Sequence, residues 1–177
     1  IAGFLSIRIL LNTLGIEDYG LYSVVFGLVS FTSFLSAGMF KSTQRYIAFS
    51  LGKKDQKSLQ KIYSINLLIY AALSVVIFLI LETLGLWFIK NILTISQDKI
   101  KIALVVYQLL IFSFISSLFI TPFAAIITAH ENMSVFSYIS LVEAFLKLGS
   151  AIALTIAPSE KLILYAIFIL IASVITT

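Results

Sequence analysis

Long runs of apolar residues, separated by short polar stretches, make up most of this sequence. Residues 102–129 contain 28 consecutive positions without a charged side chain, and residues 19–40 contain 22. A hydrocarbon core of about 30 Å is crossed by about 20 helical residues. The runs are continuous rather than alternating, which is typical of membrane helices and not of membrane β-strands. The pattern predicts six helices, at residues 1–14, 19–50, 56–89, 102–129, 132–157 and 161–177.

The composition agrees with this pattern. The chain is 60% hydrophobic and only 11% charged, whereas a soluble domain carries about 25% charged residues. We therefore expect an all-α integral membrane protein. The sequence opens and stops inside apolar runs, so we also expect its first and sixth helices to be cut from a longer chain. The absence of cysteine excludes disulfides and cysteine-ligated metal sites.

The distribution of basic residues predicts the orientation in the membrane. The region between the second and third helices holds six of them, namely Lys41, Arg45, Lys53, Lys54, Lys57 and Lys61. The stretch "NTLGIED" between the first two helices has two acids and no base. Cytoplasmic loops are enriched in Lys and Arg, so the pattern predicts a cytoplasmic N-terminus. A nucleic-acid site is a weaker explanation of the same cluster, because basic loops beside membrane spans are usually topology signals.

Charged residues inside the predicted spans are the main candidates for function, because burying a charge in hydrocarbon costs several kcal/mol. Glu143 and Lys147 are four residues apart and share one helix face. Two interpretations remain open: a structural ion pair, or a water-filled cavity in which Lys147 meets an anionic substrate. Arg8, in the first helix, keeps its proton and must face a partner, a cavity or an anion. Glu82 is a weaker candidate for a functional residue, because it lies close to Trp87, a residue type common at the membrane interface.

Small residues recur at three-residue spacing in the second helix, at Gly27, Ser30, Ser33 and Ser36. Ser113, Ser116, Ser117 and Thr121 form a similar series in the fourth helix. Small residues allow helices to approach closely, so we interpret both series as packing surfaces rather than a substrate path. The sequence contains no recognisable metal-ligand cluster, catalytic triad or phosphate-binding loop. We therefore expect a protein that is not an enzyme and has no bound cofactor.

The stretch "LLNTLGIEDYGLYSVVFGLVSFTSFLSAGMFKSTQRYIAFSLGKKD" resembles the polysaccharide-exporter branch of the multidrug/oligosaccharidyl-lipid/polysaccharide exporter superfamily. It is most similar to bacterial O-antigen, or lipopolysaccharide, flippases, as are the later strings "IITAHENM" and "KLILYAI". The resemblance implies a two-lobed transporter of twelve to fourteen helices in the bacterial inner membrane, of which this chain is the six-helix N-terminal lobe. Members move undecaprenyl-pyrophosphate-linked oligosaccharide from the cytoplasmic to the periplasmic leaflet by alternating access, in some cases coupled to Na⁺ or H⁺.

The resemblance also assigns roles to particular residues. Arg8 matches the arginine that precedes "LLNTLG", while Gln44 and Arg45 fall in "STQRY" at the cytoplasmic mouth. Glu143 and Lys147 match no fixed motif of the family. We propose them as cavity residues only because a charge inside a membrane span is costly unless it has a partner or faces water. The implied partners are the lipid-linked oligosaccharide, membrane lipid and enzymes of polysaccharide assembly, with no nucleic acid.

Two alternatives to the flippase remain at this stage. A cation-coupled multidrug efflux transporter would prefer acidic residues in its cavity. A membrane-embedded glycosyltransferase or ligase of the same pathway would need embedded carboxylates or a large loop with catalytic residues. No loop between the predicted helices exceeds about 20 residues, so the enzyme is not favoured by the sequence at hand.

Overall fold

The computed structural model describes residues 2–54, 56–93, 96–156 and 161–176. Over these residues the chain forms helices and no strands, which confirms the predicted all-α class. The elements are α1 (Ala2–Ser30), α2 (Ser33–Gly52), α3 (Gln56–Ile80), the π-helical turn η1 (Leu81–Gly85), α4 (Leu86–Asn91), α5 (Gln97–Ala129), α6 (Met133–Ile156) and α7 (Lys161–Ile175). Three predicted helix limits, at Ile1, Ala157 and Thr177, lie outside the described residues.

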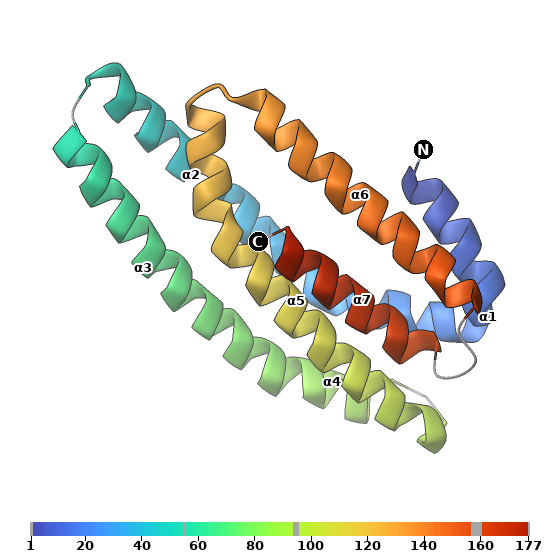
Figure 1. Ribbon diagram of the computed structural model, residues 1–177. Coiled ribbons are helices and arrows are strands. Elements are labelled where there is room, and N and C mark those ends of the chain that lie inside the picture. The colour runs from blue at the N-terminus through green and yellow to red at the C-terminus, as the bar shows by residue number, and fades with distance from the viewer. Residues whose placement is uncertain (1, 55, 94–95, 157–160, 177) are drawn as a thin grey trace.

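A single glycine makes the corner between the first two predicted helices. Gly15 has φ 82° and ψ 169°, and it is the one non-helical residue inside α1. Because a positive φ favours glycine, the chain can turn sharply here and continue as a helix on both sides (Figure 1). The sequence predicted a polar loop over residues 15–18, whereas the structure keeps all but Gly15 helical.

The second predicted helix, residues 19–50, is interrupted at Phe31 and Thr32. The two pieces, Ser6–Ser30 and Ser33–Gly52, meet at an angle of 40°. Hydroxyl groups next to the interruption donate to carbonyl oxygens of the preceding turn: Ser30 to Gly27 at 3.1 Å and Thr32 to Val29 at 2.7 Å. Such bonds compete with the backbone ladder and bend helices, which accounts for the difference from the predicted continuous helix.

The third predicted helix, residues 56–89, is a nearly straight succession of α3, η1 and α4 that ends at Asn91. The carbonyl of Leu81, at the start of the π-helical turn, accepts a hydrogen bond from the hydroxyl of Tyr107 on α5 at 2.7 Å. Gly85 lies directly beneath this hydroxyl, where a Cβ atom would collide with it. The turn therefore joins α3 to α5 by a buried hydrogen bond.

Helix α5 is the centre of the bundle. It contacts α1, α2, α3, α4, α6 and α7, and Figure 1 shows α3 and α6 on opposite sides of it. Its buried face contributes Val106, Tyr107, Leu110 and Ile111 to a core shared with every other helix except α2. The longest uncharged run of the sequence thus becomes the most enclosed helix.

Three helical stretches are long and apolar enough to cross a membrane: Gln56–Asn91, Lys99–Ala129 and Met133–Thr155. The bent pair α1–α2 counts as a fourth if it is taken as one span, and α7 is a shorter apolar helix of 15 residues. Large apolar side chains also cover the outside of the bundle, with Leu68 71% and Phe145 70% exposed. Such a surface suits lipid rather than water, so this is a multi-pass membrane protein.

Charged side chains gather at the two ends of the bundle. At one end Lys99, near the start of α5, bridges Asp18 at 2.7 Å and Glu17 at 3.0 Å, just after the Gly15 corner. The basic cluster predicted to be cytoplasmic lies at the other end, around the turn from α2 to α3 (Figure 1). The arrangement is consistent with the predicted topology, and which end faces the cytoplasm stays a prediction.

Candidate functional site

A cavity of about 460 Å³ lies between α1, α2, α5, α6 and α7. Six of its sixteen lining residues are apolar, with side chains such as Phe26 and Leu110. The other ten are Glu143, Lys147, two tyrosines and six serines, namely Ser30, Ser33, Ser36, Ser113, Ser117 and Ser173. A hydroxyl-rich hollow inside an otherwise apolar bundle is the most distinctive site among the described residues.

Glu143 and Lys147 form an ion pair on the cavity side of α6. The Lys147 Nζ donates to Glu143 Oε1 at 2.6 Å, across one turn of the helix. The Lys147 side chain remains 52% exposed and the Glu143 side chain 43% exposed. The two interpretations that the sequence left open are therefore compatible, because the residues neutralise each other and also line the cavity.

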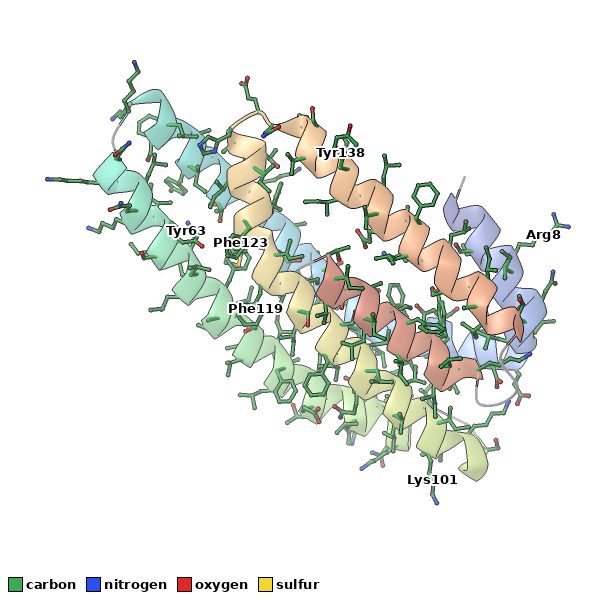
Figure 2. All side chains as sticks on the ribbon, viewed as in Figure 1. Arg8, Tyr63, Lys101, Phe119, Phe123 and Tyr138 are labelled. Atoms are coloured by element: carbon green, nitrogen blue, oxygen red, sulfur yellow. The ribbon has the colours of Figure 1, made fainter. Side chains whose placement is uncertain are left out.

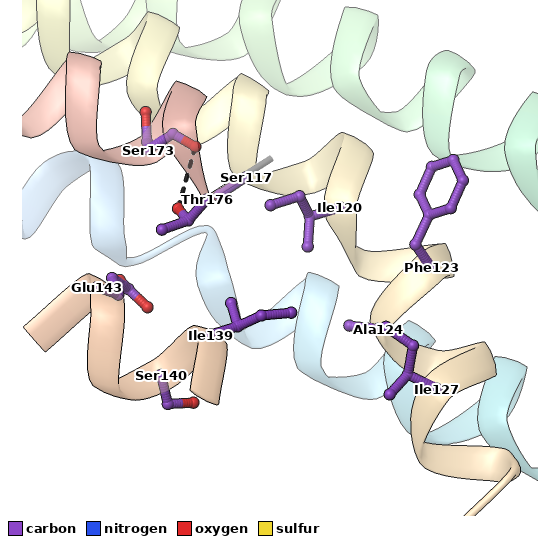
Figure 3. A pocket seen from close by; sticks show the side chains of 10 residues that line it. All are labelled: Ser117, Ile120, Phe123, Ala124, Ile127, Ile139, Ser140, Glu143, Ser173 and Thr176. Carbon is purple, nitrogen blue, oxygen red and sulfur yellow. Dashed lines mark hydrogen bonds between the residues drawn. The ribbon is translucent and has the colours of Figure 1, made fainter. Parts of the chain in front are cut away.

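A second hollow of about 280 Å³ adjoins the first (Figure 3). Its wall is mostly apolar and comes from α5, α6 and α7, with side chains such as Ile120, Ala124 and Ile139. Ser117, Glu143 and Ser173 line both hollows. Glu143 thus stands where an apolar compartment meets a polar one.

The serine hydroxyls of the polar wall have defined donor and acceptor roles. Ser36 donates to Ser33 O at 2.8 Å and Ser117 donates to Phe114 O at 2.7 Å, as Ser30 does within α1. A hydroxyl whose proton is used in this way still offers its oxygen as an acceptor. The Ser113 hydroxyl differs, because the side chain is only 8% exposed and has no hydrogen-bond partner among the described residues.

The serine series was interpreted from the sequence as a packing surface, and the structure shows a different role. Gly27 and Gly38 have open space where a side chain would be, so these positions do not serve close helix contact. Ser30, Ser33 and Ser36 line the cavity instead. The residue type in the sequence could have indicated this role. Alanine and glycine would allow close helix packing equally well, whereas a row of serines also provides hydrogen-bonding groups.

The sequence profile of the MatE family matches residues 2–153. This chain belongs to the MatE family. Proteins of that family are membrane exporters rather than enzymes. No curated protein and no solved structure matches the chain significantly. The match covers α1 to nearly the end of α6, and together with the all-helical fold it supports a lobe of an exporter-type transporter.

Arg8 does not share the cavity of this MatE lobe with Lys147. Its side chain is exposed, points outward from α1 (Figure 2) and lines neither hollow. The helical period explains this placement, since Ser6 and Leu10 form the buried face and Arg8 between them falls on the opposite one. Arg8 also forms no ion pair with any residue that the structure describes.

Gln44 and Arg45, assigned to the cytoplasmic mouth, lie in the second half of α2, at the basic end of the MatE lobe. Arg45 is exposed and Gln44 is half-buried, and neither lines the two hollows. The neighbouring Thr43 is buried and donates to Asn66 Oδ1 at 2.9 Å, which ties α2 to α3. Within the described parts of the chain, no three His, Asp or Glu side chains are placed to hold a metal ion.

Proposed function

We propose that this MatE protein is a flippase for lipid-linked oligosaccharide. Its substrate is undecaprenyl-pyrophosphate-linked sugar, which it moves from the cytoplasmic to the periplasmic leaflet of the bacterial inner membrane by alternating access. The strings that resemble O-antigen flippases support this substrate, as does the chemistry of the cavity. The product would serve the synthesis of lipopolysaccharide or another surface polysaccharide.

The observation that carries the proposal is the serine-rich cavity beside Lys147. Sugars present many hydroxyl donors, and serine oxygens whose own protons are already engaged can accept from them. A pyrophosphate offers only acceptors, and the ammonium of Lys147 provides three donors and a positive charge. The cavity thus has partners for both polar parts of the substrate.

Glu143 gives the cavity a neutral resting state. An unpaired lysine in a membrane is costly, and the 2.6 Å contact with Glu143 offsets that cost while no substrate is bound. A drug exporter coupled to cations would prefer a free acid in this position. Here the one acid of the polar wall is already paired with a lysine, which favours the flippase over multidrug efflux.

Loss of surface polysaccharide in variants of the intact protein tests the proposal. We expect Lys147→Ala to abolish surface polysaccharide at unchanged protein level and Lys147→Arg to retain part of it. Lys101→Ala is the matched control, since Lys101 is exposed on α5 and lines neither hollow (Figure 2). Normal polysaccharide from Lys147→Ala would refute the role of Lys147, and drug sensitivity as the only defect of a deletion strain would refute the flippase.

A further inference from the structure

A groove runs between α2 and α3 at the basic end of the lobe (Figure 1). It has a volume of about 250 Å³, and its lining residues all come from these two helices: Met39, Ser42, Thr43, Tyr46, Ile62, Ile65, Asn66 and Ile69. Ser42, Tyr46, Ile65 and Ile69 are exposed. None of the described residues of α5 lines the groove, so it opens away from the centre of the bundle.

A hydrogen bond joins the two walls of this groove. The Thr43 hydroxyl, buried on α2, donates to Asn66 Oδ1 on α3 at 2.9 Å. The Asn66 amide in turn donates to the Ile62 carbonyl of its own helix at 2.9 Å, which fixes the orientation of the Asn66 side chain. The other lining residues are largely apolar or aromatic, namely Met39, Tyr46, Ile62, Ile65 and Ile69. The groove is therefore held open between two connected helices and suits a hydrocarbon chain.

One face of α2 leads from the groove to the basic turn. Met39, Ser42 and Tyr46 are three and four residues apart, and the same spacing continues to Phe49 and Lys53. The Lys53 Nζ lies 4.4 Å from the centre of the Phe49 ring, and both side chains are exposed. At 1.5 Å per residue, Lys53 is about 10 Å beyond Tyr46 and about 21 Å beyond Met39. One leaflet contains about 15 Å of hydrocarbon, so the groove lies at the depth of acyl chains when Lys53 lies among the headgroups.

The turn at the end of this face is strongly basic. Residues 53–61 contain a single acid, Asp55, and four lysines, namely Lys53, Lys54, Lys57 and Lys61. All four lysines are exposed, and none of them forms an ion pair with a residue that the structure describes. Clusters of this kind beside a membrane attract anionic headgroups. The charge of the turn is thus complementary to a negatively charged lipid.

We propose that the groove between α2 and α3 binds one anionic phospholipid, with an acyl chain between the helices and the phosphate at Lys53. The tail and the head of such a lipid match the apolar groove and the basic turn in the same order. A general attraction of basic loops to the membrane needs neither the groove nor a particular lysine, whereas this site needs both. The site is independent of the proposed function, because it shares no lining residue with the two hollows.

Two lysines of the turn provide a matched test of the headgroup contact. Lys53→Gln and Lys57→Gln each remove one positive charge from the same turn. Lys53 continues the groove face of α2, whereas Lys57 is five residues before Ile62 and about 140° around α3 from it. We expect Lys53→Gln to weaken the binding of dioleoylphosphatidylglycerol about fivefold and Lys57→Gln less than about twofold. Equal losses would overturn the site, because the attraction would then come from the turn as a whole.

Two serines provide the corresponding test of the groove. Ser42 lines it, whereas Ser64 is exposed on α3, donates to Gln60 O at 3.0 Å and does not line it. Ser42→Phe fills the groove without changing the charge, and Ser64→Phe adds the same ring elsewhere. We expect Ser42→Phe to weaken phosphatidylglycerol binding about tenfold, as when about two methylene groups leave the groove. Ser64→Phe should have no effect, and unchanged binding by Ser42→Phe would overturn the site.

Binding is measured by native mass spectrometry of the intact protein, which is delipidated in detergent and titrated with one lipid at a time. We expect the first dioleoylphosphatidylglycerol to bind about tenfold more tightly than dioleoylphosphatidylcholine. Equal affinity for the two phospholipids would overturn the proposal. A competing polyprenyl pyrophosphate should leave the phosphatidylglycerol bound. Its displacement would assign the groove to a polyprenyl lipid and overturn the assignment to phospholipid.

Discussion

The contact between Gly85 and Tyr107 offers a sharp test of how the helices are packed. The Tyr107 side chain is fully buried, and its hydroxyl donates to the carbonyl of Leu81 in the π-helical turn. A Cβ atom on Gly85 would collide with that hydroxyl and would lie 2.7 Å from the ring carbon that bears it. Gly85→Ala therefore forces the ring to move and breaks the hydrogen bond.

The size of the effect follows from opposing contributions. Overpacking costs about 1–3 kcal/mol, and the lost hydrogen bond adds about 1 kcal/mol. Alanine regains about 1 kcal/mol of helix propensity over glycine, so the net destabilisation should be about 1–3 kcal/mol. Tyr107→Phe keeps the ring but removes the buried hydrogen bond to the Leu81 carbonyl, which should also cost about 1–3 kcal/mol.

The double variant tests whether Gly85 and Tyr107 are in direct contact, because the effects of two independent substitutions would simply add. Phenylalanine removes the atom in closest conflict with the new methyl group, although its ring must still shift by several tenths of an ångström. We expect Gly85→Ala with Tyr107→Phe to be more stable than the sum of the single changes by at least about 1 kcal/mol. Gly149→Ala is the control, because open space surrounds that glycine of α6, and it should be neutral or stabilising.

The assay is reversible unfolding in mixed micelles, in which the fraction of folded protein is followed against the mole fraction of denaturing detergent. Additive destabilisation in the double variant would refute the proposed contact. So would a Gly85→Ala protein as stable as Gly149→Ala, since both substitutions would then meet open space.

Two further predictions concern the ion pairs. Lys99→Met should lower stability only slightly, because the bridge to Asp18 is partly exposed, and the difference from wild type should vanish in unfolding curves at high salt. Glu143→Gln should lower stability more, by about 1–3 kcal/mol, since it leaves Lys147 unpaired in the membrane. Adding Lys147→Met should restore stability in the same assay but not the export of polysaccharide, and recovered export would show that the pair is only structural.

The sequence alone determined the all-helical membrane class of the protein. Uncharged runs such as residues 102–129 cannot be hydrated over their whole length, and in a membrane they can satisfy their backbone only as helices. The spacing of Glu143 and Lys147 likewise predicted their ion pair, because residues four apart meet on any α-helix. These inferences depend on local geometry, which a sequence specifies directly.

Other features depended on contacts between distant segments. The sequence predicted one continuous helix over residues 19–50, whereas the structure interrupts it at Phe31 and Thr32, beside a cavity that α5, α6 and α7 complete. The outward direction of Arg8 depends on which face of α1 meets α6, which its own helix does not encode. The role of the serine series also depended on the tertiary structure. Whether a serine packs against another helix or lines a cavity depends on which segment lies opposite it, and the sequence of its own helix does not specify that segment.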